Sequence, residues 1–281
     1  HVIRIKGRPL VLRESVWSQG REAIKEELDK YAEEYKAMFE RQAPQADQPK
    51  TMLPTDPKNI WMEGIGLIGL GANAKAASIA GDLVVQNARV RAIGEDAGGF
   101  RPISEKDLFD CEYWSLEQAK LGKGAPPKFQ GKVVMITGGS GTIGFAIAEA
   151  FSKLGAQTIL VDKDEIALKE SVTKLGVGHK YFPIDVTHSD AANQALLAAI
   201  NNFGGLDILI SNAGAAHAGP MLDISNEELR NAFELNFFSH YSFSTEAAKI
   251  LKDQNRGGQI LFNISKQAVN PGKNFGAYGL P

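Results

Sequence analysis

Short apolar runs alternate with longer amphipathic segments along the chain from residue 132 onward. Five runs are dominated by apolar residues: "KVVMIT", "QTILVDKD", "KYFPIDVT", "LDILISNAG" and "GQILFNIS". Because they lack an apolar–polar alternation, these runs predict strands that are buried on both faces. Their strict interleaving with helices predicts a parallel sheet, so residues 132–281 are expected to form a doubly wound α/β domain of the Rossmann type.

Four segments between and after these runs have helical periodicity. They are "GFAIAEAFSKLG", "DEIALKESVTKLG", "SDAANQALLAAINNFG" and the longer "NEELRNAFELNFFSHYSFSTEAAKILK". Gly155 stands at the end of the first segment, where glycine commonly ends a helix. The last segment is predicted to be one long helix.

The first 120 residues show a different order of elements. "HVIRIKGRPLVL" alternates apolar and polar residues and predicts a strand. "REAIKEELDKYAEEYKAMFE" has apolar residues three and four positions apart, which predicts an amphipathic helix. After a Pro-rich connection, "IWMEGIGLIGLG" predicts a strand and a turn, and residues 75–93 predict a second helix. Residues 121–131 combine Gly, Pro and Lys and predict a linker between two domains.

Composition narrows the classes of partner. The 281 residues carry a formal net charge of −2 with a pI near 6.3, so no general attraction to nucleic acid is expected. Charged residues interrupt the most apolar stretch, which argues against a membrane span. The single cysteine, Cys111, rules out an internal disulfide and fits a reducing, cytoplasmic location.

The pattern G-x-G-x-x-G, which lets backbone approach a dinucleotide pyrophosphate, occurs twice. "GIGLIG" at residues 64–69 is not followed at the expected distance by a second strand ending in an acid, so we interpret it as a glycine-kinked strand. "GSGTIG" at residues 139–144 lies between a strand and a helix, as phosphate binding at a helix N-terminus requires. Asp162 closes the next strand, where a carboxylate can accept hydrogen bonds from ribose hydroxyls. This charge predicts NAD rather than NADP, and Lys163 can soften the preference.

With Thr137 included, the loop reads "TGGSGTIG" and resembles the fingerprint of the short-chain dehydrogenase/reductase family. Gly138, Gly141 and Gly144 have the spacing of the extended branch of that family, whereas the usual spacing places a Gly where Thr142 stands. Further family landmarks follow in order: "DV" at 185–186, "SNAG" at 211–214, the Asn of "FELNFF", and Ser265 thirteen residues before Tyr278. The resemblance covers residues 131–281.

The resemblance implies a role for each landmark. Ser265 would hydrogen-bond the substrate oxygen, Tyr278 would act as acid and base, and Asn236 would help to hold a proton-relay water. The implied cofactor contacts are Gly138, Ser140, Gly141, Ile143, Gly144, Asp162, Asp185, Val186, Asn212, Ala213 and Gly214, with Asp185 and Val186 near adenine. Singly, the same residues have structural interpretations, such as a strand-end cap for Ser265 or a half-buried loop aromatic for Tyr278.

The end of the sequence falls inside a family pattern. The family places Lys four residues after the catalytic Tyr, and the sequence stops at Pro281, three residues after Tyr278. We therefore expect the chain to be a truncated piece of a longer protein in which Lys follows Pro281. Without that Lys, the fragment is expected to be inactive by itself.

Two segments, "LFDCEYWSLEQAKL" at 108–121 and "NISKQAVNPGKNFGAYGLP" at 263–281, are similar to a narrower group. This group joins a class II aldolase to a short-chain dehydrogenase, as in the rhamnulose-1-phosphate aldolase/alcohol dehydrogenases. The resemblance implies that residues 1–120 are the C-terminal part of an aldolase-like domain, an α+β tail ahead of the dehydrogenase at 132–281. Such aldolases bind zinc through several His, and His1 is the only His before residue 179, so no metal site is expected.

The implied activity is NAD-dependent interconversion of a small alcohol and an aldehyde or ketone. The aldolase group suggests lactaldehyde or a related sugar fragment as substrate, within rhamnose catabolism, and we expect a homo-oligomer. An alternative is a non-catalytic sensor of NAD(H), which the extended-branch glycine spacing favours. Ser265, Asn236 and Tyr278 argue against a sensor, because a sensor needs no proton-transfer groups. The aldolase-like part could also serve only as a docking or oligomer contact.

Overall fold

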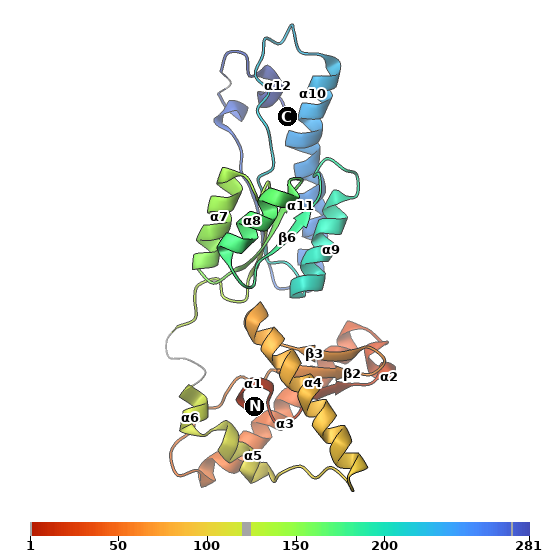
Figure 1. The fold of residues 1–281 in the computed structure, drawn as a ribbon, viewed down its shortest axis with the longest axis vertical. Helices are drawn as coiled ribbons and strands as arrows, with labels where there is room; N and C mark the ends of the chain where they lie inside the picture. The colour runs from red at the N-terminus through yellow and green to blue at the C-terminus, as the bar shows by residue number, and fades with distance from the viewer. Residues whose placement is uncertain (1, 120–124, 271) are drawn as a thin grey trace. The chain divides into compact units, whose positions relative to one another are not determined.

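The chain folds into two compact units in the computed structural model, which describes residues 2–119, 125–270 and 272–281 (Figure 1). Unit 1 is His1–Ala125 and unit 2 is Pro126–Pro281. The linker predicted at residues 121–131 spans this division, and its first four residues lie outside the described part of the chain. None of the described helices is long and apolar enough to cross a membrane.

Unit 2 contains the predicted parallel sheet. Its strands run in the order β6-β5-β4-β7-β8, and every neighbouring pair is parallel. The bounds are β4 Val133–Thr137, β5 Gln157–Asp162, β6 Lys180–Pro183, β7 Ile208–Ser211 and β8 Gln259–Phe262. The prediction of a doubly wound parallel sheet is confirmed.

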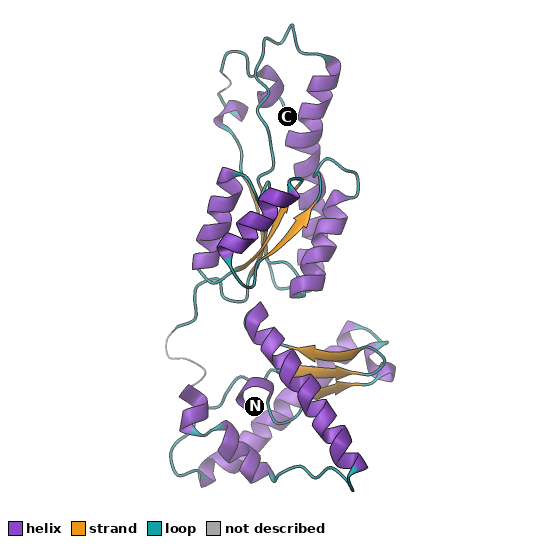
Figure 2. Cartoon of the chain, in the orientation of Figure 1, coloured by secondary structure: helices purple, strands orange, loops and turns teal. Residues whose placement is uncertain are grey.

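Helices cover both faces of this sheet (Figures 1 and 2). One face packs against α7 (Thr142–Lys153) and α8 (Glu165–Leu175), and its core includes Ile136, Leu160 and Leu168. The other face packs against α9 (Ala191–Phe203) and α11 (Ser239–Gln254), and its core includes Met135, Leu209 and Phe243. Each central strand therefore contributes alternate residues to two separate cores, which is why its sequence is apolar throughout.

The two outer strands differ from the prediction that all five are buried. Every residue of β4 and β7 is buried, whereas β6 and β8 contain no buried residue among their described positions. Each outer strand has a single hydrogen-bonded neighbour, so one edge is not covered by the sheet. Leu261 and Phe262 in β8 are about half exposed.

The predicted single long helix is interrupted. It comprises α10 (Asn226–Phe233), a π-helical segment η3 (Glu234–Phe238) and α11. A reciprocal capping box between Ser225 and Glu228 fixes its start. The π-helical turn adds one residue to the helical repeat, and Asn236 lies within it.

Unit 1 is built on a three-stranded sheet in the order β1-β2-β3. β1 (Leu10–Leu12) pairs parallel to β2 (Asn59–Met62), and β2 pairs antiparallel to β3 (Gly66–Gly69). The two predicted helices are confirmed as α3 (Arg21–Gln42) and α4 (Ala74–Asp96), and α4 packs on β3. Shorter elements complete the unit: α1 (Val2–Ile5), α2 (Glu14–Trp17), η1 (Ala43–Gln45), α5 (Glu105–Glu112) and α6 (Ser115–Gln118).

The prediction of a strand over "HVIRIKGRPLVL" is wrong for its first half. Val2–Ile5 form α1, and the strand is confined to Leu10–Leu12. Ile3 and Ile5 are both buried because α1 packs against α4 and α5, so apolar residues two positions apart arise without a strand. Lys6 then adopts a left-handed backbone with φ of 57°, which no extended strand permits.

The first glycine motif forms a hairpin between β2 and β3 rather than a phosphate loop. Gly64 and Gly66 have positive φ values of 77° and 136°, which the turn requires. Gly69 faces the backbone of α4, and a Cβ there would overlap the amide of Gly81. These glycines thus serve a tight turn and close packing between strand and helix.

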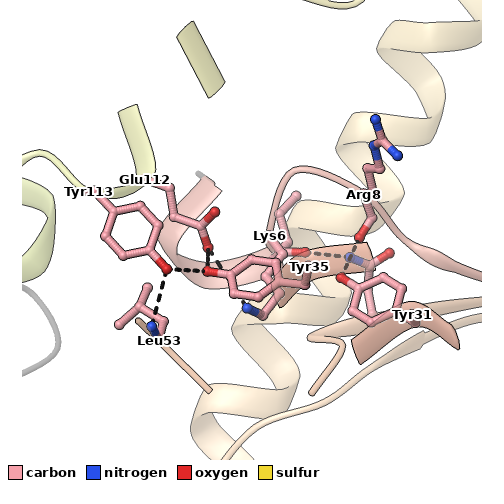
Figure 3. Close-up of polar contacts among 9 residues, drawn as sticks. Lys6, Arg8, Tyr31, Tyr35, Leu53, Glu112 and Tyr113 are labelled. Atoms are coloured by element: carbon pink, nitrogen blue, oxygen red, sulfur yellow. Dashed lines mark hydrogen bonds and ion pairs between the residues drawn. The ribbon is translucent and has the colours of Figure 1, made fainter. Parts of the chain in front are cut away.

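A polar network lies inside unit 1 among the aromatic residues of its core (Figure 3). The Tyr35 hydroxyl is 3.0 Å from Glu112 Oε1 and 2.8 Å from the Tyr113 hydroxyl, which accepts from the amide of Leu53. Lys6 Nζ lies 3.3 Å from the centroid of the Tyr35 ring and 3.9 Å from Glu112 Oε1, and this nitrogen has no hydrogen-bond partner among the described residues. Burial lowers the pKa of Lys6 to about 8, and burial also raises the pKa of Glu112.

This environment predicts that unit 1 becomes more stable as the pH rises from about 8 to 10. The folded state releases the Lys6 proton near pH 8, whereas an unfolded Lys holds it to about 10.5. The free energy of unfolding should therefore rise across this window, by roughly 1–3 kcal/mol. The three tryptophans, Trp17, Trp61 and Trp114, all lie in unit 1, so urea unfolding followed by Trp fluorescence reports on this unit. Lys6→Met should flatten the rise, and an equally steep rise in that variant would exclude Lys6 as its cause.

Candidate cofactor and active site

The carboxyl ends of the strands of unit 2 surround a cleft of about 1000 Å³. It lies where the order of strands reverses, between β4 and β7, which is the usual ligand position in an open α/β sheet. Residues that follow all five strands line it. The lining includes Gly138, Gly141, Ile143, Gly144, Asp162, Asp185, Val186, Asn212, Ala213, Gly214, Asn236, Ser265 and Tyr278.

The glycine loop joins β4 to α7 at the floor of this cleft. Gly138 has a positive φ of 64°, which turns the chain after the strand. Gly144 sits in the first turn of α7, and a Cβ there would overlap the carbonyl oxygen of Gly138 and lie 3.0 Å from Asn212 Nδ2. At Gly141, a Cβ would meet nothing nearer than the Gly138 oxygen at 3.4 Å, so this backbone is open to the cleft. Glycine thus suits these two positions for different physical reasons: close packing at Gly144 and an open backbone at Gly141.

Asp162 ends β5 beside the loop. Its Oδ2 accepts hydrogen bonds from the Ser140 hydroxyl at 2.6 Å and the Ser140 amide at 3.2 Å. Its Oδ1 accepts from the amide of Lys163 at 2.8 Å. Ser140 itself does not line the cleft, so its contribution is to orient the Asp162 carboxylate.

Asp185 and Val186 lie just beyond β6, which ends at Pro183 and not at the "DV" pair as predicted. Ile184 still donates its amide to Asp162 O, which holds this segment along β5. Burial acts to raise the pKa of Asp185, but hydrogen bonds from Thr187 and the charge of Lys163 bring it below its ordinary value. Lys163 Nζ is 4.0 Å from Asp185 Oδ2, so one exposed cation lies beside this carboxylate at the rim.

The segment from Ser211 to Ala215, called here the β7 turn, is anchored by three neighbouring elements. Thr137 Oγ1 accepts from the amides of Asn212 and Ala213, at 2.9 and 3.0 Å. Asn212 donates to the carbonyls of Thr137 and Gly138, and its Oδ1 accepts from Asn263 after β8. From the π-helical segment, Asn236 Oδ1 accepts from the Ala215 amide and Nδ2 donates to the Ala215 carbonyl.

Ser265 and Tyr278 face the same cleft from the last part of the chain. Ser265 caps the short helix η4 (Lys266–Ala268), and its Oγ accepts from the Gln267 amide. Tyr278 lies in α12 (Gly276–Gly279), which packs against η4. Within the described residues, the Tyr278 hydroxyl makes no hydrogen bond, so it can meet a ligand.

Sequence reasoning missed several residues of the cleft. His240, Tyr241, Phe262 and Asn263 line it, yet no motif marks them. His240 is one of four histidines scattered between residues 179 and 240 with no metal-ligand spacing, and a strand-end Asn such as Asn263 resembles any loop Asn. Within the described residues, no group of three or more His, Cys, Asp or Glu side chains is arranged to hold a metal ion.

Family models match both halves of the chain. The model for short chain dehydrogenase matches residues 132–280, and that for the second domain of class II aldolase matches residues 1–121. The first match covers more than half of the chain and contains the cleft. The chain belongs to the short-chain dehydrogenase family.

Individual relatives of this short-chain dehydrogenase chain agree with that membership. It is 30% identical to an uncharacterized oxidoreductase, YuxG, of Bacillus subtilis, over 99% of this chain and 41% of the relative. It is 36% identical to a probable NADP-dependent mannitol dehydrogenase of Yarrowia lipolytica, over 54% of this chain and 57% of the relative. A solved NAD+-bound xylitol dehydrogenase is 29% identical with a TM-score of 0.52, over 54% of this chain and 60% of that chain. The chain thus spans about half the length of these relatives.

The different roles of the two loop glycines give a prediction for stability. Gly144→Ala should destabilise unit 2 by about 1–3 kcal/mol, because the new methyl group overlaps backbone that cannot move aside. Gly141→Ala should change the free energy of unfolding by much less, since its Cβ meets only ordinary contact and its φ of −71° suits any residue. Calorimetric unfolding of both variants tests this, and equal losses would contradict the assignment.

Proposed function

We propose that the chain carries the cofactor cleft of an NAD-dependent oxidoreductase that interconverts a small hydroxyl compound and its carbonyl form. The observation that carries the proposal is that Ser265 and Tyr278 line the same cleft as the glycine loop. In the same proposal, residues 132–281 form the dehydrogenase domain, residues 121–131 a linker, and residues 1–120 the C-terminal part of an aldolase-like domain. The non-catalytic sensor has less support, because a sensor needs no such hydroxyl pair.

The residues around the loop fit a dinucleotide. The backbone is open at Gly141, and the first amides of the twelve-residue helix α7 meet the cleft there, so a pyrophosphate can approach both. Gly138, Ile143 and Gly144 would shape this end of the site, and Ser140 would act through Asp162. Asp162 would accept hydrogen bonds from the adenosine ribose, Asp185 and Val186 would border adenine, and Asn212, Ala213 and Gly214 would form the opposite wall.

The reaction requires a proton and a hydride to leave or join one carbon–oxygen group. When bound, the nicotinamide supplies the hydride acceptor or donor. The Gln267 amide donates to one lone pair of Ser265 Oγ. The O–H of Ser265 therefore remains available to donate to the substrate oxygen. The Tyr278 hydroxyl would give or take the proton. Asn236 binds Ala215 with one lone pair of Oδ1 and one hydrogen of Nδ2. The second lone pair and the second hydrogen would bind a water in the proton relay.

The proposed substrate is a small polyol or a related hydroxy compound. The mannitol and xylitol dehydrogenases among the relatives support this class, and the aldolase match to residues 1–121 supports a sugar fragment such as lactaldehyde, within rhamnose catabolism. Comparing turnover of lactaldehyde with that of a linear polyol would decide between the two.

The charge of Asp162 predicts preference for NADH over NADPH. A 2′-phosphate would meet a carboxylate held in place by Ser140 and Lys163, and we expect a difference of about 1–3 kcal/mol in binding. Asp162→Asn keeps an oxygen for Ser140 but removes the charge, so it should narrow the difference. Asp223→Ala removes an exposed carboxylate that does not line the cleft and serves as the control. Equal affinities of the unaltered chain in fluorescence titrations would contradict the role of Asp162.

The Tyr278 hydroxyl gives the test of catalysis. In the enzyme that contains this chain, Tyr278→Phe should lower kcat by roughly 10²–10⁴-fold and leave the Kd for NADH unchanged, because it removes the proton donor and little volume. Tyr181→Phe in β6 removes a phenol that does not line the cleft and should leave kcat near its starting value. A loss below about tenfold for Tyr278→Phe would exclude it as the acid/base.

A further inference from the structure

His240 contacts the β7 turn from inside the helix that follows Asn236. Its Nδ1 lies 2.7 Å from Ser211 Oγ, and its ring also forms a hydrogen bond with the backbone of Ala213. His240 is four residues after Asn236, so both side chains reach the turn from one side of the helical segment. The two residues therefore hold opposite ends of the turn, Ser211 and Ala215.

Ser211 needs a hydrogen-bond partner for its side-chain hydroxyl. It ends β7 and is only 1% exposed, so its hydroxyl is cut off from water. A buried hydroxyl without a partner is costly, and His240 provides that partner. The Ser211 carbonyl is already used by the Asn263 amide after β8. Ser211 thus connects β7, β8 and α11 at the base of the turn.

The ring of His240 suits this role in its neutral form. Burial lowers the pKa of His240, while the hydrogen bond with Ala213 opposes that effect. A neutral imidazole can accept the Ser211 hydrogen at one nitrogen and carry hydrogen on the other. The ring also approaches Phe262, with 6.1 Å between ring centroids. The ring thus has a polar contact with the turn and an apolar contact with β8.

We propose that His240 is a positioning residue that sets the affinity for the dinucleotide by holding the β7 turn against the cleft. The proposal rests on the proposed function, because it assigns a ligand to the wall formed by Asn212, Ala213 and Gly214. His240 acts through Ser211 and Ala213, and the chemistry of hydride and proton transfer remains with Ser265 and Tyr278.

Five variants of the chain, including Ser211→Ala by itself, test the proposal by NADH fluorescence titration at 25 °C, with thermal unfolding measured in parallel. His240→Leu keeps the packing on Phe262 but leaves Ser211 Oγ without a partner, and we expect the Kd for NADH to rise about tenfold. His240→Asn places an amide oxygen close to the position of Nδ1, and we expect it to recover most of the affinity. His217→Leu is the control, since His217 does not line the cleft. The double variant Ser211→Ala/His240→Leu should bind NADH no more weakly than His240→Leu alone, because the contact that Ser211→Ala removes is already absent in His240→Leu.

The outcomes separate this proposal from the function on which it rests. If the unaltered chain binds neither NADH nor NADPH, the proposed function fails and the role of His240 fails with it. If the unaltered chain binds NADH and His240→Leu binds it equally well, the role of His240 alone is overturned, even where the melting temperature falls. If His240→Leu does not fold, the comparison passes to His240→Asn and Ser211→Ala. A loss of affinity in Ser211→Ala with recovery in His240→Asn supports the proposal, and unchanged affinity in Ser211→Ala overturns it.

Discussion

Helix α7 begins so close to the ends of β4 and β7 that no side chain fits between them, and the cleft depends on this approach. A methyl group on Gly144 would overlap the Gly138 carbonyl and crowd the Asn212 amide. Because Gly144 has no side chain, Asn212 can donate to the carbonyls of Thr137 and Gly138 and join two strand ends that are not joined by a loop. The first turn of α7 then faces the cleft, and its unpaired amides form the positive end of a helix dipole. The floor of the site therefore follows from backbone packing.

Side chains, rather than backbone packing, hold the β7 turn in place. Thr137 accepts two amides of the turn, Asn236 pairs with both backbone groups of Ala215, and His240 takes the hydroxyl of Ser211. Thr137, Ser211 and Ala213 are buried, so their polar groups need these partners for the turn to keep one conformation. The π-helical turn between α10 and α11 adds one residue to the helical repeat, and Asn236 lies within this turn. A regular helix would change the alignment of α10 relative to His240.

The sheet and the glycine loop could be predicted from the sequence because their physical causes are local. Continuous apolar runs reflect burial on two faces, and the spacing of Gly138, Gly141 and Gly144 reflects a tight turn followed by close packing. The failures arise where tertiary contacts decide. Val2–Ile5 alternates as a strand would, yet packing against two helices buries both Ile residues in a helical turn. The contact between Ser211 and His240 joins residues 29 positions apart, for which no periodic pattern exists. The π-helical segment likewise interrupts what the periodicity predicts as one helix.

Charged and neutral groups lie on different sides of the cleft. In the described part of the chain, the charged residues that line the cleft are Asp162, Lys163 and Asp185, and all three stand at the ends of β5 and β6. The β7 turn on the other side is held by neutral groups, including an imidazole whose pKa burial lowers. A buried charge in that position would carry a desolvation cost of the kind that lowers the pKa of Lys6 in unit 1. Neutral hydrogen bonds can fix the turn without that cost, whereas the charged groups at the rim stay partly in contact with water. In the proposed function, the side of the cleft at β7 positions the ligand, and the side at the ends of β5 and β6 selects the cofactor.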